Sequence, residues 1–376
     1  MTVLVVNAGS SSIKVALFAR DLTPLAQARV TEIGTDARHG DVLAIAPDHG
    51  AALALCLDGF AAQGFGVADL TAAAHRVVHG GPHLTAPCRI TPDTIAQIEG
   101  CVPLAPLHNP ANLMAIRALA GLLPDLPQCA SFDTAFHATN PDVARRYALP
   151  PQAEALGLRR YGFHGISYAS LVANLPGLTG RALPGRLLAL HLGNGASLCA
   201  IRDGRSVATT MGYSPLDGLT MGTRAGSIDG NAVLRLAERH GIDGASQILN
   251  RQSGLLGLGG HSDMRALHGA GTADAAFAID HFCYWIVRHA GSMIAAMGGL
   301  DAIAFTGGIG ENDAHVRCQV IKGLAWAGTS VNDAANAAGA VCLHDVTSRV
   351  AIWTVPAAEE RHIAAETLAV LALGGI

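Results

Sequence analysis

Residues 3–18 read VLVVNAGSSSIKVALF, and this stretch decides how the chain begins to fold. Its two apolar runs, Val3–Val6 and Val15–Phe18, are short and bounded by small or polar residues, as buried strands are. Between them stand an amide, small residues and Lys14, a composition that predicts a tight turn joining two strands. Backbone N–H groups in such a turn can face an anion, and Lys14 would add a point charge. A plain hairpin turn is the alternative.

Lys14 stands out because the chain has 25 basic residues and only Lys14 and Lys322 are lysines. Arginine fills the other basic positions, so a lysine here indicates that the site needs a compact ammonium group. The stretch lacks the GxxxxGK[ST] pattern, which excludes a Walker loop.

Composition excludes several classes of function. The 376-residue chain is 50% hydrophobic and 14% charged, which predicts a large buried core. A formal net charge of −4 gives no electrostatic basis for binding nucleic acid or an anionic membrane. We find neither a signal-peptide pattern nor an apolar run of membrane-spanning length, and the eight cysteines occur singly. We therefore expect a cytoplasmic protein with reduced thiols that binds neither nucleic acid nor membrane.

Short apolar runs alternate with helical patterns along the chain, and this alternation predicts an α/β fold. The expected strands include Ala130–Phe136, Arg186–Leu192 and Leu300–Thr306. Asn231–Gly241 has the pattern of an amphipathic helix, and residues 275–299 that of a long buried one.

The chain also contains an internal echo. Val5–Leu17 resembles Leu190–Ile201, which reads LHLGNGASLCAI, and alignment of Ser12 with Ser197 separates the two by about half the chain. Each segment is a predicted strand, a turn of small residues and a second strand, so the echo predicts a duplicated domain. A chance similarity between two glycine-containing hairpins is the alternative.

The domain boundary is expected near Ala148–Arg160, a stretch that contains two prolines. We predict a first domain over residues 1–150 and a second over residues 151–360. The helical pattern at about 361–376 is expected to pack back on the first domain.

Two further glycine turns follow predicted strands. Residues 191–197 read HLGNGAS, and residues 304–312 read AFTGGIGEN, a strand followed by three glycines and a helical pattern. Phosphate groups bind where backbone N–H groups cluster at a helix N-terminus, so these turns are candidates for nucleotide binding. The first fits a tight turn equally well, and the second does not match the GxGxxG pattern of Rossmann domains.

Four titratable side chains stand out because small or apolar residues surround them: Arg76 in a predicted strand, Arg224 in a loop, His164 between glycines and Asp133 in a predicted strand. Arginine can hold a carboxylate with two parallel hydrogen bonds. A buried carboxylate is costly unless it is paired or functional. A solvated edge arginine and a core histidine are the alternatives for Arg76 and His164. With Lys14 and the glycine turns, these groups match the needs of phosphoryl transfer.

The motifs resemble those of the acetate kinase family, within the superfamily of acetate and sugar kinases, Hsp70 and actin. NAGSSSIK, HRVVHGG, LAPLHNPAN, FDTAFH, RYGFHG, HLGNGAS, GTRAGSID, FTGGIGEN and EER occur in the family order. The resemblance implies two duplicated actin-like (ribonuclease H-like) α/β domains that flank a nucleotide cleft. It also implies reversible transfer of a phosphoryl group from ATP to acetate, giving acetyl phosphate and ADP, with Mg²⁺ or Mn²⁺ as cofactor and a homodimer as the assembly.

The resemblance implies catalytic and metal-binding roles for five residues. Asp133, His164 and Arg224 would be catalytic, and Asn7 and Glu359 would hold the metal. Acetate is already ionised at pH 7, so we expect Asp133 to position magnesium or water rather than to abstract a proton.

The resemblance also implies two sets of binding residues. Acetate would contact Arg76 and a methyl pocket formed by Val78, Leu107, Phe163 and Pro215. The nucleotide would contact Ser10, Ser12, Lys14, His191, Leu192, Gly193, Asn194, Gly195, Asp263, Met264, Arg265, Gly308, Ile309, Gly310, Glu311 and Asn312.

Two other functions stay open at this point. A kinase for propionate or another short carboxylate fits the same motifs. A non-kinase ATPase, such as a chaperone or a filament protein of the superfamily, would need a peptide-binding or polymerising appendage, for which 376 residues leave no room.

Overall fold

The computed structural model describes residues 2–34, 37–40 and 42–373. It divides into two units. Unit 1 contains the residues up to Phe136 and those from Ala358 onward, and unit 2 contains His137–Ala357. The first division therefore falls earlier in the chain than residue 150, where the sequence placed it.

Unit 1 is built on an eight-stranded sheet. β1 (Thr2–Ala8) and β2 (Ser12–Ala19) form the antiparallel hairpin predicted from the opening stretch. β3 (Pro24–Thr31) continues the antiparallel side, whereas β6 (Leu70–Val77) and β8 (Gln128–Phe132) run parallel to β1 on its other side. The short strands β4 (Arg38–His39), β5 (Val42–Leu43) and β7 (Cys88–Arg89) complete the order β5-β4-β3-β2-β1-β6-β8-β7.

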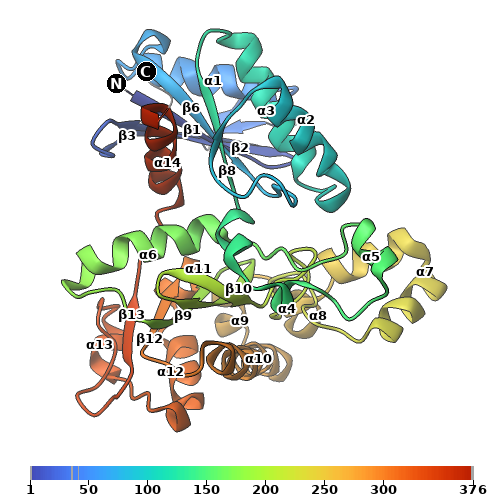
Figure 1. Ribbon diagram of the computed structural model, residues 1–376, viewed down its shortest axis with the longest axis vertical. Coiled ribbons are helices and arrows are strands. Elements are labelled where there is room, and N and C mark those ends of the chain that lie inside the picture. Colours follow the sequence, from blue (N-terminus) through green and yellow to red (C-terminus); the bar gives the residue numbers. More distant parts are fainter. Residues whose placement is uncertain (1, 35–36, 41, 374–376) are drawn as a thin grey trace. The chain divides into compact units, whose positions relative to one another are not determined.

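Side chains alternate between the two faces of this sheet, and helices cover both faces. On one face Leu4, Val6 and Ile13 are buried in a cluster with residues of α1 (His49–Ala61) and α3 (Asn109–Leu122). On the other face α14 (Glu359–Leu373) packs against β1, β6 and β8, so the red C-terminal helix lies with the blue strands in Figure 1. α2 (Pro92–Gly100) packs against α3.

Unit 2 repeats the central strand arrangement of unit 1. β9 (Arg186–Leu192) and β10 (Ala196–Arg202) form an antiparallel hairpin, which β11 (Arg205–Thr209) extends. β12 (Ala302–Thr306) and β13 (Ala351–Thr354) lie parallel to β9 on its other side. The order β11-β10-β9-β12-β13 corresponds to β3-β2-β1-β6-β8, so the predicted α/β class and the duplication are confirmed.

Helices surround the sheet of unit 2, where α6 (Gly165–Thr179) packs against β9 and α10 (Ala273–Met297) against β9, β10 and β11. The other helices are α4 (Asp142–Arg145), α5 (Pro151–Ala155), α7 (Gly230–Arg251), α8 (Gly254–Gly259), α9 (Met264–Ala270), α11 (Gly307–Asn312), α12 (Ala314–Gly323) and α13 (Asp333–Ala337). Short 3₁₀ helices occupy Val67–Asp69, Val102–Leu104, Ala135–Thr139 and Ala325–Ala327. Within the described residues, no helix combines the length and apolarity needed to cross a membrane.

Two expected elements differ from the structure. The strand expected over Ala130–Phe136 ends at Phe132, and a 3₁₀ helix follows, so Asp133 stands just beyond the strand. The expectation that residues 275–299 form a buried helix was wrong for one face of α10, on which Phe277 and Tyr284 are exposed. The helix expected over Asn231–Gly241 is confirmed as the first segment of α7, because Gly241, with a φ of 71°, ends it and a second helical segment continues to Arg251.

Candidate active site

Arg76 lies at the end of β6 among the charged groups of unit 1. Its Nε and Nη2 atoms donate to the two carboxylate oxygens of buried Asp133, at 3.0 and 2.6 Å, and its Nη1 donates to Asn7 Oδ1 at 3.2 Å. Burial would lower the pKa of Arg76, but Asp133, with smaller effects of Glu359 and Glu360, raises it above its usual value. Described residues use three of the five guanidinium N–H groups, which leaves two for a ligand.

The register of the sheet explains why these groups meet. Parallel pairing places Val6 beside His75, so the next residues, Asn7 and Arg76, are also neighbours. Antiparallel pairing places Lys14 opposite Asn7. Because successive residues of a strand point to opposite faces, Arg76, Asn7 and Lys14 share one face, the one that α14 covers.

The first turn of α14 brings two carboxylates to that face. Glu360 accepts a hydrogen bond from Lys14 Nζ at 2.6 Å. Burial raises the pKa of Glu359 to about 7 against the opposing effect of Arg76, and the carboxylates of Asp133 and Glu360 add to the rise. Crowding of these carboxylates makes the cluster favourable for a bound cation.

Asn7 and Glu359 offer the kind of oxygen ligands that Mg²⁺ prefers. In the described ranges, we find no group of three or more His, Cys, Asp and Glu side chains arranged to hold a metal ion. Mg²⁺ commonly takes only one or two protein carboxylates and completes its shell with water and substrate phosphates. The donors therefore fit Mg²⁺ bound together with a phosphorylated substrate.

Two buried asparagines of α3 hold the strand ends that carry these residues. Asn112 Nδ2 donates to Ala8 O at 2.9 Å, and its Oδ1 accepts from Val78 N at 3.1 Å. Asn112 thus joins the backbone directly after Asn7 to the backbone two residues after Arg76.

Asn109 repeats this arrangement one helical turn earlier, donating to His79 O at 3.0 Å and accepting from His79 N at 3.1 Å. Sequence reasoning did not assign either asparagine to the site. The signal was their spacing in NPAN, since residues three apart lie on the same face of a helix.

The other residues expected to contact phosphates or acetate divide between the two units. Ser10 is exposed in the β1–β2 turn and Ser12 begins β2. Val78 follows β6 and is buried, whereas Leu107 precedes α3 and is 49% exposed. Phe163 is buried in unit 2, and Pro215 belongs to unit 2 as well.

His164 directly precedes α6 in unit 2. Its φ of 58° is a left-handed conformation that is uncommon for residues other than glycine and often marks functional sites. Its ring stacks on that of His191 with centroids 4.2 Å apart, and its Nδ1 hydrogen-bonds Ser197 Oγ at 2.9 Å. Ser167 lies in the first turn of α6, where its Oγ contacts His191 Nδ1 at 2.8 Å.

Arg224 lies in the loop between β11 and α7, and its Nη1 donates to Pro215 O at 2.6 Å. A side chain at Gly195 would place its Cβ 2.9 Å from Arg224 Nη2 and 3.2 Å from His164 Nε2, so both groups converge on Gly195. No described residue forms an ion pair with Arg224, and burial lowers its pKa. An arginine that is largely withdrawn from water without a counter-ion is complementary to an anionic ligand.

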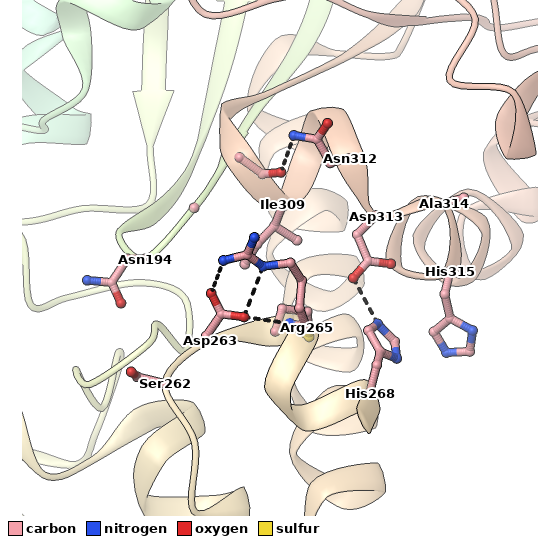
Figure 2. A pocket seen from close by; sticks show the side chains of 13 residues that line it. Asn194, Ser262, Asp263, Arg265, His268, Ile309, Asn312, Asp313, Ala314 and His315 are labelled. Carbon is pink, nitrogen blue, oxygen red and sulfur yellow. Dashed lines mark hydrogen bonds and ion pairs between the residues drawn. The ribbon is translucent and has the colours of Figure 1, made fainter. Parts of the chain in front are cut away.

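A pocket of about 930 Å³ adjoins the β9–β10 turn in unit 2 (Figure 2). Eight expected nucleotide contacts line it: Gly193, Asn194, Asp263, Met264, Arg265, Gly308, Ile309 and Asn312. Ser262, His268, Asp313, Ala314 and His315 also line it and were not expected from the sequence. The structure thus brings together segments that lie far apart in the chain.

The remaining expected contacts of unit 2 support the walls of this pocket. Leu192 is fully buried within β9, and Gly310 is buried within α11. Glu311 Oε1 accepts hydrogen bonds from the backbone N–H groups of Gly307 and Ala357, each at 2.9 Å. The second of these contacts ties α11 to the segment that follows β13.

Asp263 and Arg265 form one rim of the pocket. Asp263 caps α9 by accepting from the backbone N–H groups of Arg265 and Ala266. The hydrogen bond from the Arg265 side chain, with those backbone bonds, lowers the pKa of Asp263 to about 2. The cap and the ion pair, with 2.9 Å between Arg265 Nη2 and Asp263 Oδ2, keep both side chains at the pocket edge.

Comparison with known proteins agrees with this architecture. The model of the acetokinase family matches residues 2–365. The chain is 42% identical to an acetate kinase of Methylocella silvestris, with 98% of each chain covered. It superimposes on the crystal structure of Porphyromonas gingivalis acetate kinase with a TM-score of 0.92 and 36% identity, covering 98% of this chain and 99% of that one. A propionate kinase of Francisella tularensis gives a TM-score of 0.91 and 34% identity, covering 97% and 98%. The chain therefore belongs to the acetokinase family.

Proposed function

We propose that this protein is an acetate kinase that transfers the terminal phosphoryl group of ATP reversibly to acetate. Family membership and the acetate kinases among its relatives support the assignment. The observation that carries it is Arg224, which lacks a described counter-ion and meets His164 at Gly195, beside the pocket. A transferring phosphoryl group would supply the missing negative charge, and Arg224 and His164 would stabilise it as that charge redistributes.

Acetate would bind at Arg76. Carboxylic acids titrate near ~4, so acetate is already an anion at pH 7 and needs no general base. Asp133 holds two N–H groups of the Arg76 fork, which supports a role in orienting that fork rather than in proton abstraction. One acetate oxygen, held by Arg76 but accessible to ATP, would attack the terminal phosphorus in line.

Lys14, Ser10 and Ser12 would contact the phosphates, and Asn7 and Glu359 would hold Mg²⁺. When bound, the metal would neutralise charge on the nucleotide phosphates. We further propose that the protein works in the cytoplasm as a homodimer, as the family resemblance implies. Light scattering on the purified protein tests the dimer, and a molecular mass of one chain would contradict it.

A propionate kinase is the second candidate, because one solved structure of similar fold carries that name. We propose that Val78, Leu107, Phe163 and Pro215 surround the methyl group of acetate. Val78 is buried and β-branched, so its side chain cannot move aside at low cost. An added methylene should therefore lower kcat/KM by about 10- to 200-fold.

Hydroxamate trapping of the acyl phosphate tests both candidates. The assay would compare formate, acetate, propionate and butyrate with ATP in the wild type and in Val78→Ala. We expect acetate to be the best acceptor and Val78→Ala to narrow its advantage over propionate. Equal kcat/KM for propionate and acetate in the wild type would replace the assignment by a propionate kinase.

A further inference from the structure

One end of the pocket carries three polar side chains that no sequence motif indicated. His268 comes from α9, Asp313 directly precedes α12, and His315 lies in the first turn of α12. Figure 2 shows them on the opposite side of the pocket from Asn194. Backbone N–H groups of the glycine turn and of α11 suit phosphates, so the histidine end is left for the nucleobase.

The tautomer of His268 follows from its partner. His268 Nε2 lies 2.8 Å from Asp313 Oδ2. A carboxylate only accepts hydrogen bonds, so Nε2 must carry the proton, and Nδ1 of the neutral ring is then an acceptor. Asp313 is itself fixed, because its Oδ1 accepts from Val316 N at 3.0 Å and caps α12.

The tautomer of His315 follows in the same way. Gln319 Nε2 donates to Asp280 Oδ1 at 3.3 Å, which identifies that atom as the amide NH₂ group. The same NH₂ lies 2.8 Å from His315 Nε2, so this ring nitrogen accepts, and Nδ1 of the neutral ring carries the proton. The rings of His268 and His315 meet edge-on, with centroids 5.3 Å apart and planes at 82°, so the two side chains supply one acceptor and one donor at the same end of the pocket.

We propose that these two histidines select adenine nucleotides. His268 Nδ1 accepts a hydrogen bond from the 6-amino group, and His315 Nδ1 donates to N7. Adenine presents the donor N6–H₂ and the acceptor N7 on one edge, whereas guanine presents two acceptors, O6 and N7. With guanine, O6 would face the acceptor on His268 without a proton between them. The inference rests on the proposed function only in taking the pocket to hold the nucleotide donor.

Equilibrium dissociation constants, measured without acetate, test the proposal. The nucleotides are ATP, GTP and the triphosphate of purine riboside, which lacks the 6-amino group. In His268→Phe, the Kd for ATP should rise by about 10-fold, the usual effect of one neutral hydrogen bond. The Kd for purine riboside triphosphate should stay nearly unchanged in this variant, and the preference for ATP over GTP should shrink.

A second variant tests the role of the His268 tautomer separately from that of the ring, and a third variant is the control. In Asp313→Asn, the asparagine caps α12 equally well. Its amide can donate as well as accept hydrogen bonds, so it no longer fixes the tautomer of His268. It should reduce the ATP preference without lowering the thermal stability of unit 2. His240→Phe removes an exposed histidine of α7 and should leave every Kd unchanged.

Equal weakening of ATP and purine riboside triphosphate by His268→Phe would overturn the proposal, as would an unchanged ratio of ATP to GTP affinity. Formation of acetyl phosphate is measured separately. If the wild type formed no acetyl phosphate but the nucleotide dissociation constants changed as expected, only the acetate kinase assignment would be contradicted.

Discussion

Replacing Asn112 by alanine should destabilise unit 1 selectively. The side chain is 2% exposed and makes two hydrogen bonds, to Ala8 O and from Val78 N. Truncation leaves both backbone groups buried without this partner, at a cost of about 1–3 kcal/mol for each group. We expect the free energy of unfolding of unit 1 to fall by about 2–6 kcal/mol, compared with a usual domain stability of about 5–15 kcal/mol.

The three tryptophans allow the two units to be followed separately. Trp285, Trp326 and Trp353 all belong to unit 2, so tryptophan fluorescence reports on unit 2, whereas far-ultraviolet circular dichroism reports on both units. In urea, Asn112→Ala should move part of the circular dichroism transition to lower concentration and leave the fluorescence transition in place. Two probes are needed because a chain of two units need not unfold in one step.

Kinetics add a second readout. With the ends of β1 and β6 loosened, the KM for acetate should rise by about 10-fold or more. Asn250→Ala, which removes a partly exposed asparagine side chain of α7, is the control and should change neither property. A loss below about 1 kcal/mol for Asn112→Ala, or an equal shift of both transitions, would refute the reasoning.

Three further results are expected. Arg224→Ala should lower kcat by on the order of 10³-fold with little change in the KM for ATP, and an unaltered kcat in steady-state assays would remove its assigned role. Arg76→Lys should raise the KM for acetate, because one ammonium cannot make the paired contact of a guanidinium. A KM for acetate equal to that of the wild type would count against acetate binding at Arg76. In metal-free buffer, Glu359→Gln should become more stable relative to the wild type as pH rises from about 4.5 to 7, by about 2 kcal/mol in urea titrations. The reason is that the raised pKa of Glu359 makes its ionisation in the wild type destabilising above pH 4.5. A stability difference that does not change with pH would contradict this.

Sequence reasoning succeeded where the determinants were local. The opening hairpin and its echo in β9–β10 were predicted because apolar runs and small turn residues stand next to each other in the chain. Asp133 was placed within a strand that is too long, since Ala135 and Phe136 continue the apolar pattern while the backbone already turns. Hydrophobic periodicity indicates which residues are buried but not where a strand ends.

Contacts between distant segments could not be predicted from the sequence. Asn112 bonds to Ala8, and His268 bonds to Asp313, through side chains whose partners depend on how the elements pack. A histidine in a polar segment looks solvated when only its neighbours in sequence are known. The glycine turns were proposed to bind nucleotide because of their spacing, but the histidine end of the pocket has no such pattern.

The placement of α14 affects the order in which the protein can be completed during translation. Unit 2 is one continuous segment, whereas the sheet of unit 1 lacks its second cover until α14 has been translated. Until then Ala72 and Cys129 belong to an uncovered apolar face, and Lys14 lacks Glu360. A nascent chain can therefore complete unit 2 before unit 1, and the residues proposed to bind acetate and metal are assembled only once α14 has emerged.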